Sequence, residues 1–447
     1  MPLANLADNF KMPQPADNLC LSAKALRTEE QPISFLMAAA VQGGPDLISL
    51  AAGLIDPETL PIDDVRAACD RLLTPGPRGK ETLQYGTTHG LRRLRAKVVE
   101  HVCRLDGTTC DDLSLTPDNV IVTTGSQQSL YLLAETLLDV GDIVIAADPS
   151  YFVYTGTLAS FGAKVLTVPM DAGGMSMDAL EHLLQQLERD GRLPRVKFIY
   201  CQSYYQNPTG LTLAEDRRPR LVELARRFST HHRLLVLEDA AYRELGYDAP
   251  PPPSVKRYDP QNLYVATTFT FSKPFSAGLK TGYAILPDDL VDPVLQQKGN
   301  HDFGSPNLCQ QIVDEALETG VYARHLDGLK KAYKAKRDAM LAALEKHMPA
   351  EAYWTKPGGG LYVWLTLPEG TDTGRHGPMF AECLRAGVMY VPGAFCHQPD
   401  GSGHRPGNSC RLSFGVVPLE RIELGIERLA GVIKAQLAER TTTRKAV

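Results

Sequence analysis

Short apolar runs alternate regularly with longer amphipathic runs between about residues 117 and 290. The short runs have the character of buried strands, and the longer runs repeat apolar residues at helical spacing. This alternation predicts an α/β fold, with a mainly parallel sheet flanked by helices on both faces. The expected strands are 119–125, 142–147, 164–169, 196–200, 233–239, 262–269 and 281–287. The expected helices are 126–138, 151–162, 177–191 and 213–230.

The C-terminal part of the chain has a different pattern. A long charged helix is expected at 328–348, followed by an apolar run at 358–368, a helix near 377–386 and a second apolar run at 410–417. This mixture indicates a smaller α+β domain, and we expect the first 60 or so residues to pack with it. The predicted organisation is an N-terminal arm with part of the small domain, a large domain and a C-terminal small domain, at 1–60, 61–325 and 326–447.

Composition excludes several classes of protein. The chain has 447 residues, a net charge of -5 and a pI near 6.1, so it lacks the basic balance that general nucleic-acid binding requires. No apolar run approaches the roughly 18 residues that suggest a membrane-spanning helix, so no membrane partner is expected. Residues 1–20 show neither a basic nor an apolar leader segment, which predicts a cytoplasmic protein.

Cysteine and histidine spacing gives no sign of a metal site. The nine cysteines are scattered without a CxxC pair, and their odd number is typical of reduced thiols. The histidines also lack the spacing of metal ligands. A glycine-rich run at 401–407 has the wrong spacing for a dinucleotide loop and no expected helix after it, which argues against a dehydrogenase.

Polar residues follow several expected strands, at the edge where parallel sheets bind ligands. Gly125 allows a tight turn after the first strand, and Ser126 can cap the next helix, whose free N–H groups favour a phosphate. Tyr151 follows the next strand and could stack on a flat ligand. Taken alone, these residues are more simply a helix cap and a packing aromatic.

Three more polar side chains lie at later strand ends. Asn207, in YYQNPTG, offers a side-chain donor, although a turn commonly uses Asn, Pro and Gly in any case. Asp239 ends a very apolar strand, so its carboxylate needs a partner or a raised pKa, unless it caps a helix. Tyr242 comes three residues later, on the same face if a helical turn follows.

The stretch FTFSKPFSAGLKTGYAIL, residues 269–286, places an amine among hydroxyls. Lys273 is a candidate nucleophile, whereas Thr270, Ser272 and Lys280 suit a phosphate. Taken alone, Lys273 is more simply a solvated loop residue. Together with the strand-end residues it completes the set that pyridoxal phosphate (PLP) requires, namely an amine, a carboxylate for the ring nitrogen, donors for the ring oxygen and a phosphate cradle.

The order of these motifs resembles a known family. The motifs TTGSQQ, DPSY, NPTG, EDAAY, SKPFSAGLKTGY and CRLSF follow one another as in the class I/II aminotransferases of the fold-type I PLP enzymes. The similarity covers roughly residues 45 to 430 and points to the aminoadipate/kynurenine-type branch. It implies a PLP-dependent enzyme that transfers an amino group between an L-amino acid and a 2-oxo acid by a ping-pong mechanism.

The resemblance also implies roles for individual residues. Lys273 would form the Schiff base and move a proton, Asp239 would pair with the ring nitrogen, and Tyr151 would stack on the ring. Arg411 would clamp the substrate carboxylate as a bidentate fork, with Gly53 beside the substrate. The residues expected to hold the cofactor's ring oxygen and phosphate are Asn207, Tyr242, Ser126, Gln127, Thr270, Ser272 and Lys280. Asn207 is expected to contact the substrate as well.

Two positions bear on assembly and phosphate binding. Tyr85, in LQYGTTHG, resembles the tyrosine that reaches the phosphate of the neighbouring subunit, which implies a homodimer with shared active sites. The family usually has arginine where this chain has Lys280. Because lysine keeps the charge but lacks the fork, we expect weaker or differently arranged phosphate binding.

The motifs leave other functions open. A PLP-dependent lyase, cyclase or synthase of amino-acid metabolism on the same fold would share the chemistry of Lys273. A PLP-sensing transcription regulator would carry an N-terminal winged-helix domain, whereas only about 45 residues, not basic in character, precede the aminotransferase-like part. Arg411 accounts for an α-carboxylate and leaves the substrate's side chain open.

Overall fold

The computed structural model describes residues 19–445, and the large domain is built around one eight-stranded sheet. Its strand order is β2-β9-β8-β7-β6-β3-β4-β5. Strands β4, β3, β6, β7 and β8 run parallel, whereas β9 is antiparallel to both β2 and β8, and β5 is antiparallel to β4. The bounds are β2 (Val120–Thr123), β3 (Ile143–Asp148), β4 (Lys164–Asp171), β5 (Gly174–Met175), β6 (Val196–Gln202), β7 (Leu235–Asp239), β8 (Val265–Thr270) and β9 (Gly282–Ile285).

Strands β2, β3, β6, β7 and β8 are buried almost throughout, and successive side chains of each strand point to opposite sides. In β3, Ile143 and Ile145 join one apolar cluster, with residues of α8 (Met177–Arg189) and α9 (Arg217–Arg227). Val144 and Ala146 of the same strand join another cluster, on the opposite face. The helices of that second cluster are α6 (Gly125–Leu137), α7 (Phe152–Ser160) and α10 (Asp288–Asp302). The predicted layered arrangement and the predicted mainly parallel sheet are therefore confirmed.

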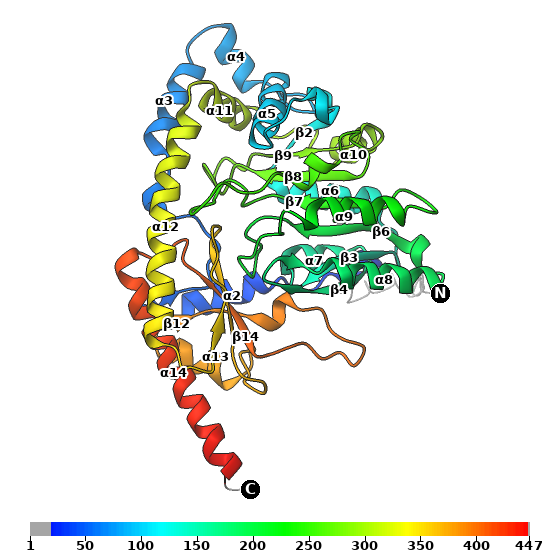
Figure 1. Cartoon of the computed structure of the whole chain (residues 1–447). Coiled ribbons are helices and arrows are strands. Elements are labelled where there is room, and N and C mark those ends of the chain that lie inside the picture. Colours follow the sequence, from blue (N-terminus) through cyan, green and yellow to red (C-terminus); the bar gives the residue numbers. More distant parts are fainter. Residues whose placement is uncertain (1–18, 446–447) are drawn as a thin grey trace, which may run out of the picture.

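The small domain is an antiparallel sheet packed against helices (Figure 1). Its strand order is β10-β11-β14-β13, and α12 runs along one side of both domains, from α11 to α14. Because α12 crosses residue 325 without a break, the predicted domain boundary falls inside one continuous helix. The bounds are β10 (Tyr353–Trp354), β11 (Tyr362–Thr366), β13 (Val391–Pro392), β14 (Ser409–Ser413), α11 (Asn307–Glu318), α12 (Val321–His347), α13 (Pro378–Arg385) and α14 (Leu419–Lys445).

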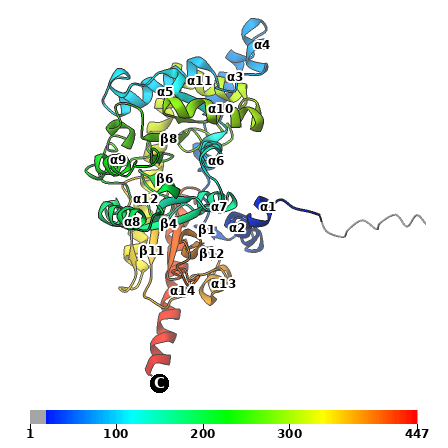
Figure 2. The ribbon, with the colours of Figure 1, turned by 90° about the vertical axis from the view of Figure 1, so that its right-hand side faces the viewer.

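The N-terminal segment contacts both domains. Strand β1 (Ile48–Ser49) pairs in parallel with β12 (Val388–Met389). Helix α1 (Ala23–Arg27) lies against α7 of the large domain (Figure 2). Lys24 Nζ donates to the hydroxyl of Tyr131, on α6, at 2.6 Å. Helix α2 (Pro32–Gln42) follows. The start of the predicted arm, residues 1–18, lies outside the described residues.

The remaining helices gather beside β2. They are α3 (Ile62–Leu72), α4 (Pro77–Leu83) and α5 (Arg92–Leu105), and all three contact α11. In Figure 1 they form the end of the large domain that lies farthest from the small domain. Within residues 19–445 no helix is long and apolar enough to cross a membrane.

Candidate functional site

Most of the predicted site residues lie where β6, β7 and β8 end, facing β14 and the loop after β1. Lys273 follows β8, and its Nζ donates to the backbone oxygen of Gly53 at 2.8 Å. The side chain keeps some accessibility through the site but lies deep among protein atoms, unlike that of a solvated loop lysine. Burial, and the cations of Arg411 and Lys280, lower the pKa of Lys273. A lowered pKa makes the uncharged amine easier to form, which suits nucleophilic and base chemistry.

Asp239 ends β7 and is almost completely buried. Its Oδ2 accepts hydrogen bonds from the Tyr200 hydroxyl at 2.9 Å and from Gln202 Nε2 at 3.0 Å. Burial raises the pKa of Asp239, and these donors oppose the rise. The chain continues in a turn, in which the Ala241 N–H donates to Oδ1, so Asp239 does not cap a helix. The result is a buried carboxylate held in a fixed orientation at the edge of the sheet.

Arg411 lies on β14 of the small domain and is 3% exposed, so it is not a surface residue. Its Nη1 donates to Asn207 Oδ1 at 2.8 Å, and its Nη2 donates to the Ala51 oxygen at 2.7 Å. Nε of Arg411 is buried and has no hydrogen-bond partner among the described residues. The guanidinium therefore retains a buried donor for a further acceptor such as a carboxylate.

Tyr242 and Tyr362 bring two hydroxyls together beside Arg411. The two hydroxyl oxygens are 3.2 Å apart, and the Arg411 guanidinium carbon is 4.3 Å from the Tyr362 ring centroid. A Cβ added to Gly53 would stand 2.7 Å from the Tyr362 hydroxyl. Glycine at position 53 therefore allows the backbone to pass close to this tyrosine.

The start of α6 and the end of β8 form a backbone cradle. Gly125 has a φ of +71°, and a Cβ added there would lie 3.8 Å from Thr270 Oγ1. Thr270 Oγ1 also accepts the Ser272 N–H at 3.1 Å. The expectation that Ser126 caps α6 is wrong, because the left-handed turn at Gly125 starts the helix one residue earlier and puts Thr124 at the cap position. Ser126 instead lies in the first turn, beside the free N–H groups.

The other predicted residues lie at the rim of this region or beyond it. Tyr151 occupies the cap position of α7, where burial raises the pKa of its hydroxyl. Gln127 is exposed, and its Nε2 is 3.5 Å from Thr157 Oγ1. Lys280 is exposed and has a left-handed backbone, with a φ of +48°. Tyr85 is 84% exposed, and its ring lies against that of Phe303.

Sequence reasoning missed three side chains of this region, namely Tyr200, Gln202 and Tyr362. Gln202 ends β6 and pairs in register with Asp239, so the strand-end rule that found Asp239 also applied to it. Tyr200 lies two residues earlier on the same face of β6. Tyr362 begins an apolar strand after three glycines, a pattern that resembles ordinary core.

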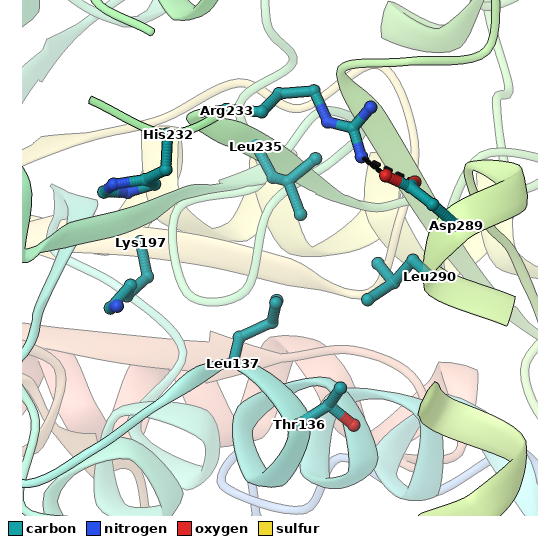
Figure 3. A pocket seen from close by; sticks show the side chains of 8 residues that line it. All are labelled: Thr136, Leu137, Lys197, His232, Arg233, Leu235, Asp289 and Leu290. Carbon is teal, nitrogen blue, oxygen red and sulfur yellow. Dashed lines mark hydrogen bonds and ion pairs between the residues drawn. The ribbon is translucent and has the colours of Figure 1, made fainter. Parts of the chain in front are cut away.

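A separate cavity of about 340 Å³ lies away from these residues (Figure 3). It is lined by Lys197 and Leu235, near the amino ends of β6 and β7, and by the ion pair of Arg233 with Asp289. Asp239 is at the opposite end of β7. In the part of the chain that the structure describes, no group of three or more His, Cys, Asp or Glu residues is arranged to hold a metal ion.

Comparison with known proteins gives consistent matches. The family model described as "Aminotransferase class I and II" matches residues 45–429. The aromatic-amino-acid aminotransferase 1 of Thermococcus litoralis is 35% identical, over 88% of this chain and 89% of that protein. The structure of a multiple substrate aminotransferase from Thermococcus profundus is 33% identical with a TM-score of 0.85, covering 94% of this chain and 98% of the other.

A further solved structure with the same fold contains a bound ligand. The α-aminoadipate aminotransferase of Thermus thermophilus, complexed with N-(5'-phosphopyridoxyl)-L-leucine, has a TM-score of 0.80. It is 32% identical and covers 94% of this chain and 98% of the other. These matches confirm the predicted resemblance, fold and activity. The chain belongs to the class I and II aminotransferases, which transfer an amino group between an amino acid and a 2-oxo acid.

Proposed function

We propose that this aminotransferase uses pyridoxal 5'-phosphate, held between the end of the large sheet and the small domain, with Lys273 as the residue that carries it. The observation that carries the proposal is a buried amine with a lowered pKa, in one region with the buried carboxylate Asp239 and the buried guanidinium Arg411. When bound, this cofactor supplies an electron sink that stabilises negative charge at the substrate Cα.

The residues present fit the cofactor. The ring nitrogen suits Asp239, because a buried carboxylate with a raised pKa gains from a positively charged partner. The ring oxygen suits donors from Asn207 and Tyr242, and Tyr151 offers a ring face for stacking. The phosphate suits the start of α6 because helix N-termini favour anions. The side chains that would complete the phosphate site are Ser126, Gln127, Thr270, Ser272 and Lys280.

Arg411 and Lys273 act on different parts of the substrate. Arg411 binds the α-carboxylate through a planar fork of donors, and Gly53 and Asn207 lie beside that position. Lys273 Nζ accepts the proton of the substrate Cα, for which a lowered pKa is needed near neutral pH. Arg411 and Tyr362 of the small domain are buried beside the site, which limits the access of water to it.

A homodimer with shared active sites is part of the proposal. Tyr85 is 84% exposed and its ring meets that of Phe303, which is 62% exposed, at 5.9 Å. Leu54 and Leu83 are also largely exposed. Exposed apolar side chains on several loops are suited to a partner subunit, and Tyr85 would reach the partner's phosphate.

The nine free cysteines support a reducing, cytoplasmic location.

Shared sites can be tested by mixing two impaired variants. Lys273→Ala removes the amine and Tyr85→Ala removes the contact expected from the partner. A hybrid dimer contains one doubly altered site and one wild-type site, so subunit exchange should restore activity that neither parent shows. Activity no higher than the sum of the two parents after exchange would contradict shared sites.

The half-reaction tests the function. The loaded enzyme is mixed with one amino acid at a time, including aromatic amino acids and 2-aminoadipate, without a 2-oxo acid. We expect loss of the visible band of the lysine-bound cofactor, release of one equivalent of 2-oxo acid, and return of the band when 2-oxoglutarate is added. Release of ammonia or a cleaved product instead would indicate a lyase on the same fold.

A further inference from the structure

A pair of buried tyrosine hydroxyls connects the two domains beside Lys273. Tyr362 begins β11 of the small domain, and Tyr242 lies in the turn after β7 of the large domain. Their hydroxyl oxygens are 3.2 Å apart, and their rings meet edge to face at 5.8 Å. The two residues are 2% and 5% exposed, so bulk water does not compete for this hydrogen bond.

The position of the Tyr362 hydroxyl is constrained from other sides. The Arg411 guanidinium lies 4.3 Å from the ring centroid, and the backbone of Gly53 passes so closely that an added Cβ would be 2.7 Å from the hydroxyl. Strand pairing of Tyr362 with Ser413 fixes the backbone. The hydroxyl is therefore held against Tyr242 by packing as well as by the hydrogen bond.

The charges around Tyr362 favour one direction for this hydrogen bond. The titratable groups that face it are Arg411, Lys273, Tyr242 and Cys396. Burial acts to raise the pKa of Tyr362, but the Arg411 cation, Lys273 and the hydrogen bond with Tyr242 together lower it. Burial and Tyr362 raise the pKa of Tyr242. Either hydroxyl can donate across this distance, and the lowered pKa of Tyr362 favours Tyr362 as the donor.

We propose that Tyr362 is a positioning residue that donates to the Tyr242 hydroxyl and directs the single proton of Tyr242 toward the cofactor's ring oxygen. The inference rests on the proposed function, in which Tyr242 contacts that oxygen. A hydroxyl has one proton, so a Tyr242 that donates to the ring oxygen accepts at its own oxygen. Accepting a hydrogen bond polarises a hydroxyl and strengthens its donation.

The hydrogen bonds from Tyr362 to Tyr242 and from Tyr242 to the ring oxygen, called the relay here, have a measurable electrostatic consequence. Tyr242 draws negative charge from the ring oxygen, and less charge there makes the adjacent lysine-bound nitrogen less basic. Removing the Tyr362 hydroxyl weakens Tyr242 as a donor. The pKa at which the visible band of the lysine-bound cofactor changes with pH should therefore rise in Tyr362→Phe, which keeps the ring against Arg411.

The experiment is a spectroscopic pH titration of the loaded protein. We expect Tyr362→Phe to raise the pKa of the visible band by about half a unit or more, the scale of one neutral hydrogen bond. The matched control is Tyr390→Phe, which removes a buried small-domain hydroxyl that donates to the Thr373 oxygen at 3.0 Å. The control should leave the titration unchanged.

A double variant tests whether the effect passes through Tyr242. Tyr242→Phe should raise the same pKa further than Tyr362→Phe does, and adding Tyr362→Phe to it should have no further effect. An unchanged titration in Tyr362→Phe would overturn the relay. The relay would also be overturned if Tyr362→Phe raised the pKa of the visible band by the same amount in the wild-type and Tyr242→Phe backgrounds. If no visible band forms with saturating cofactor, the proposed function fails first, and the relay with it.

Discussion

Arg411 of the small domain donates a hydrogen bond to Asn207 of the large domain over 2.8 Å. The guanidinium that is proposed to bind the substrate carboxylate thus contacts the amide that is proposed to bind the cofactor's ring oxygen. Asn207 follows β6 and Arg411 lies on β14, so the contact also joins the two sheets. A change at either residue is expected to affect substrate binding through the orientation of the other.

Arg411→Lys tests the carboxylate fork. Lysine keeps the positive charge but cannot donate to Asn207, Ala51 and a carboxylate in one plane. Since hydrogen bonds to charged groups are worth about 1.5–3 kcal/mol, kcat/KM for amino acids should fall roughly 10- to 100-fold. Steady-state kinetics measure the fall. Arg440→Lys, on α14, is the control and should leave kcat/KM unchanged.

Gly53→Ala tests the close approach to Tyr362. The new Cβ would stand 2.7 Å from the Tyr362 hydroxyl, so the tyrosine or the Gly53 backbone has to move. We expect kcat/KM to fall about tenfold, as for a loss of about 1.4 kcal/mol. In the Tyr362→Phe background the clash is removed, and the same substitution should cost much less. An equal cost in both backgrounds would show that Gly53 matters for another reason.

Lys280 allows charge and backbone strain to be separated. Its φ of +48° is unfavourable for a residue with a side chain. Lys280→Ala and Lys280→Gly both remove the charge, and each should weaken cofactor binding about tenfold, whereas Lys280→Arg should strengthen it. The glycine variant should unfold at a higher temperature than the alanine variant. Titration of the apo-protein with cofactor measures affinity, and an alanine variant that binds as tightly as wild type would exclude Lys280 from the phosphate site.

The ion pairs of Asp248 predict a contribution to the free energy of unfolding that depends on pH. Arg337 binds its carboxylate through two nitrogens, Lys334 adds a third contact, and these hydrogen bonds hold the pKa of Asp248 well below its ordinary value. A carboxyl with a depressed pKa stabilises the fold above its unfolded pKa and loses that contribution as pH falls. Because Asp248 is 47% exposed, solvent screening limits the effect to about 1 kcal/mol.

Asp248→Asn should therefore lower the free energy of unfolding at pH 7 and have a shrinking effect below about pH 4, near the ordinary carboxyl pKa. Urea unfolding at several pH values measures the difference. Asp292→Asn, an exposed carboxylate on α10, serves as the control. A difference between Asp248→Asn and wild type that stays constant down to pH 3 would contradict the assignment.

The large domain could be predicted from sequence because its signals are local. Continuously apolar strands such as β3 and amphipathic helices such as α8 are visible within short windows. Strand-end residues such as Asp239 followed from the rule that parallel sheets bind ligands at one edge. The mistake at Ser126 was also local, since a single glycine with positive φ moved the helix start.

The small domain's part in the site could not be predicted from the residues alone. Arg411 and Tyr362 reach the site through antiparallel pairing of β11 with β14, and neither strand carries a local sign of what it faces. Arg411 was found only through resemblance to a family. Tyr362 was missed because a tyrosine at the start of an apolar strand is usually core, and its neighbours Tyr242 and Gly53 are far away in the sequence.

Borohydride reduction followed by peptide mass mapping shows which lysine carries the cofactor. Reduction fixes a lysine-bound cofactor as a stable secondary amine. We predict that the phosphopyridoxyl group is found on the peptide containing Lys273, and that Lys273→Ala abolishes both the label and the visible band. Labelling of another lysine such as Lys280, or no label with saturating cofactor, would show that Lys273 does not carry the cofactor.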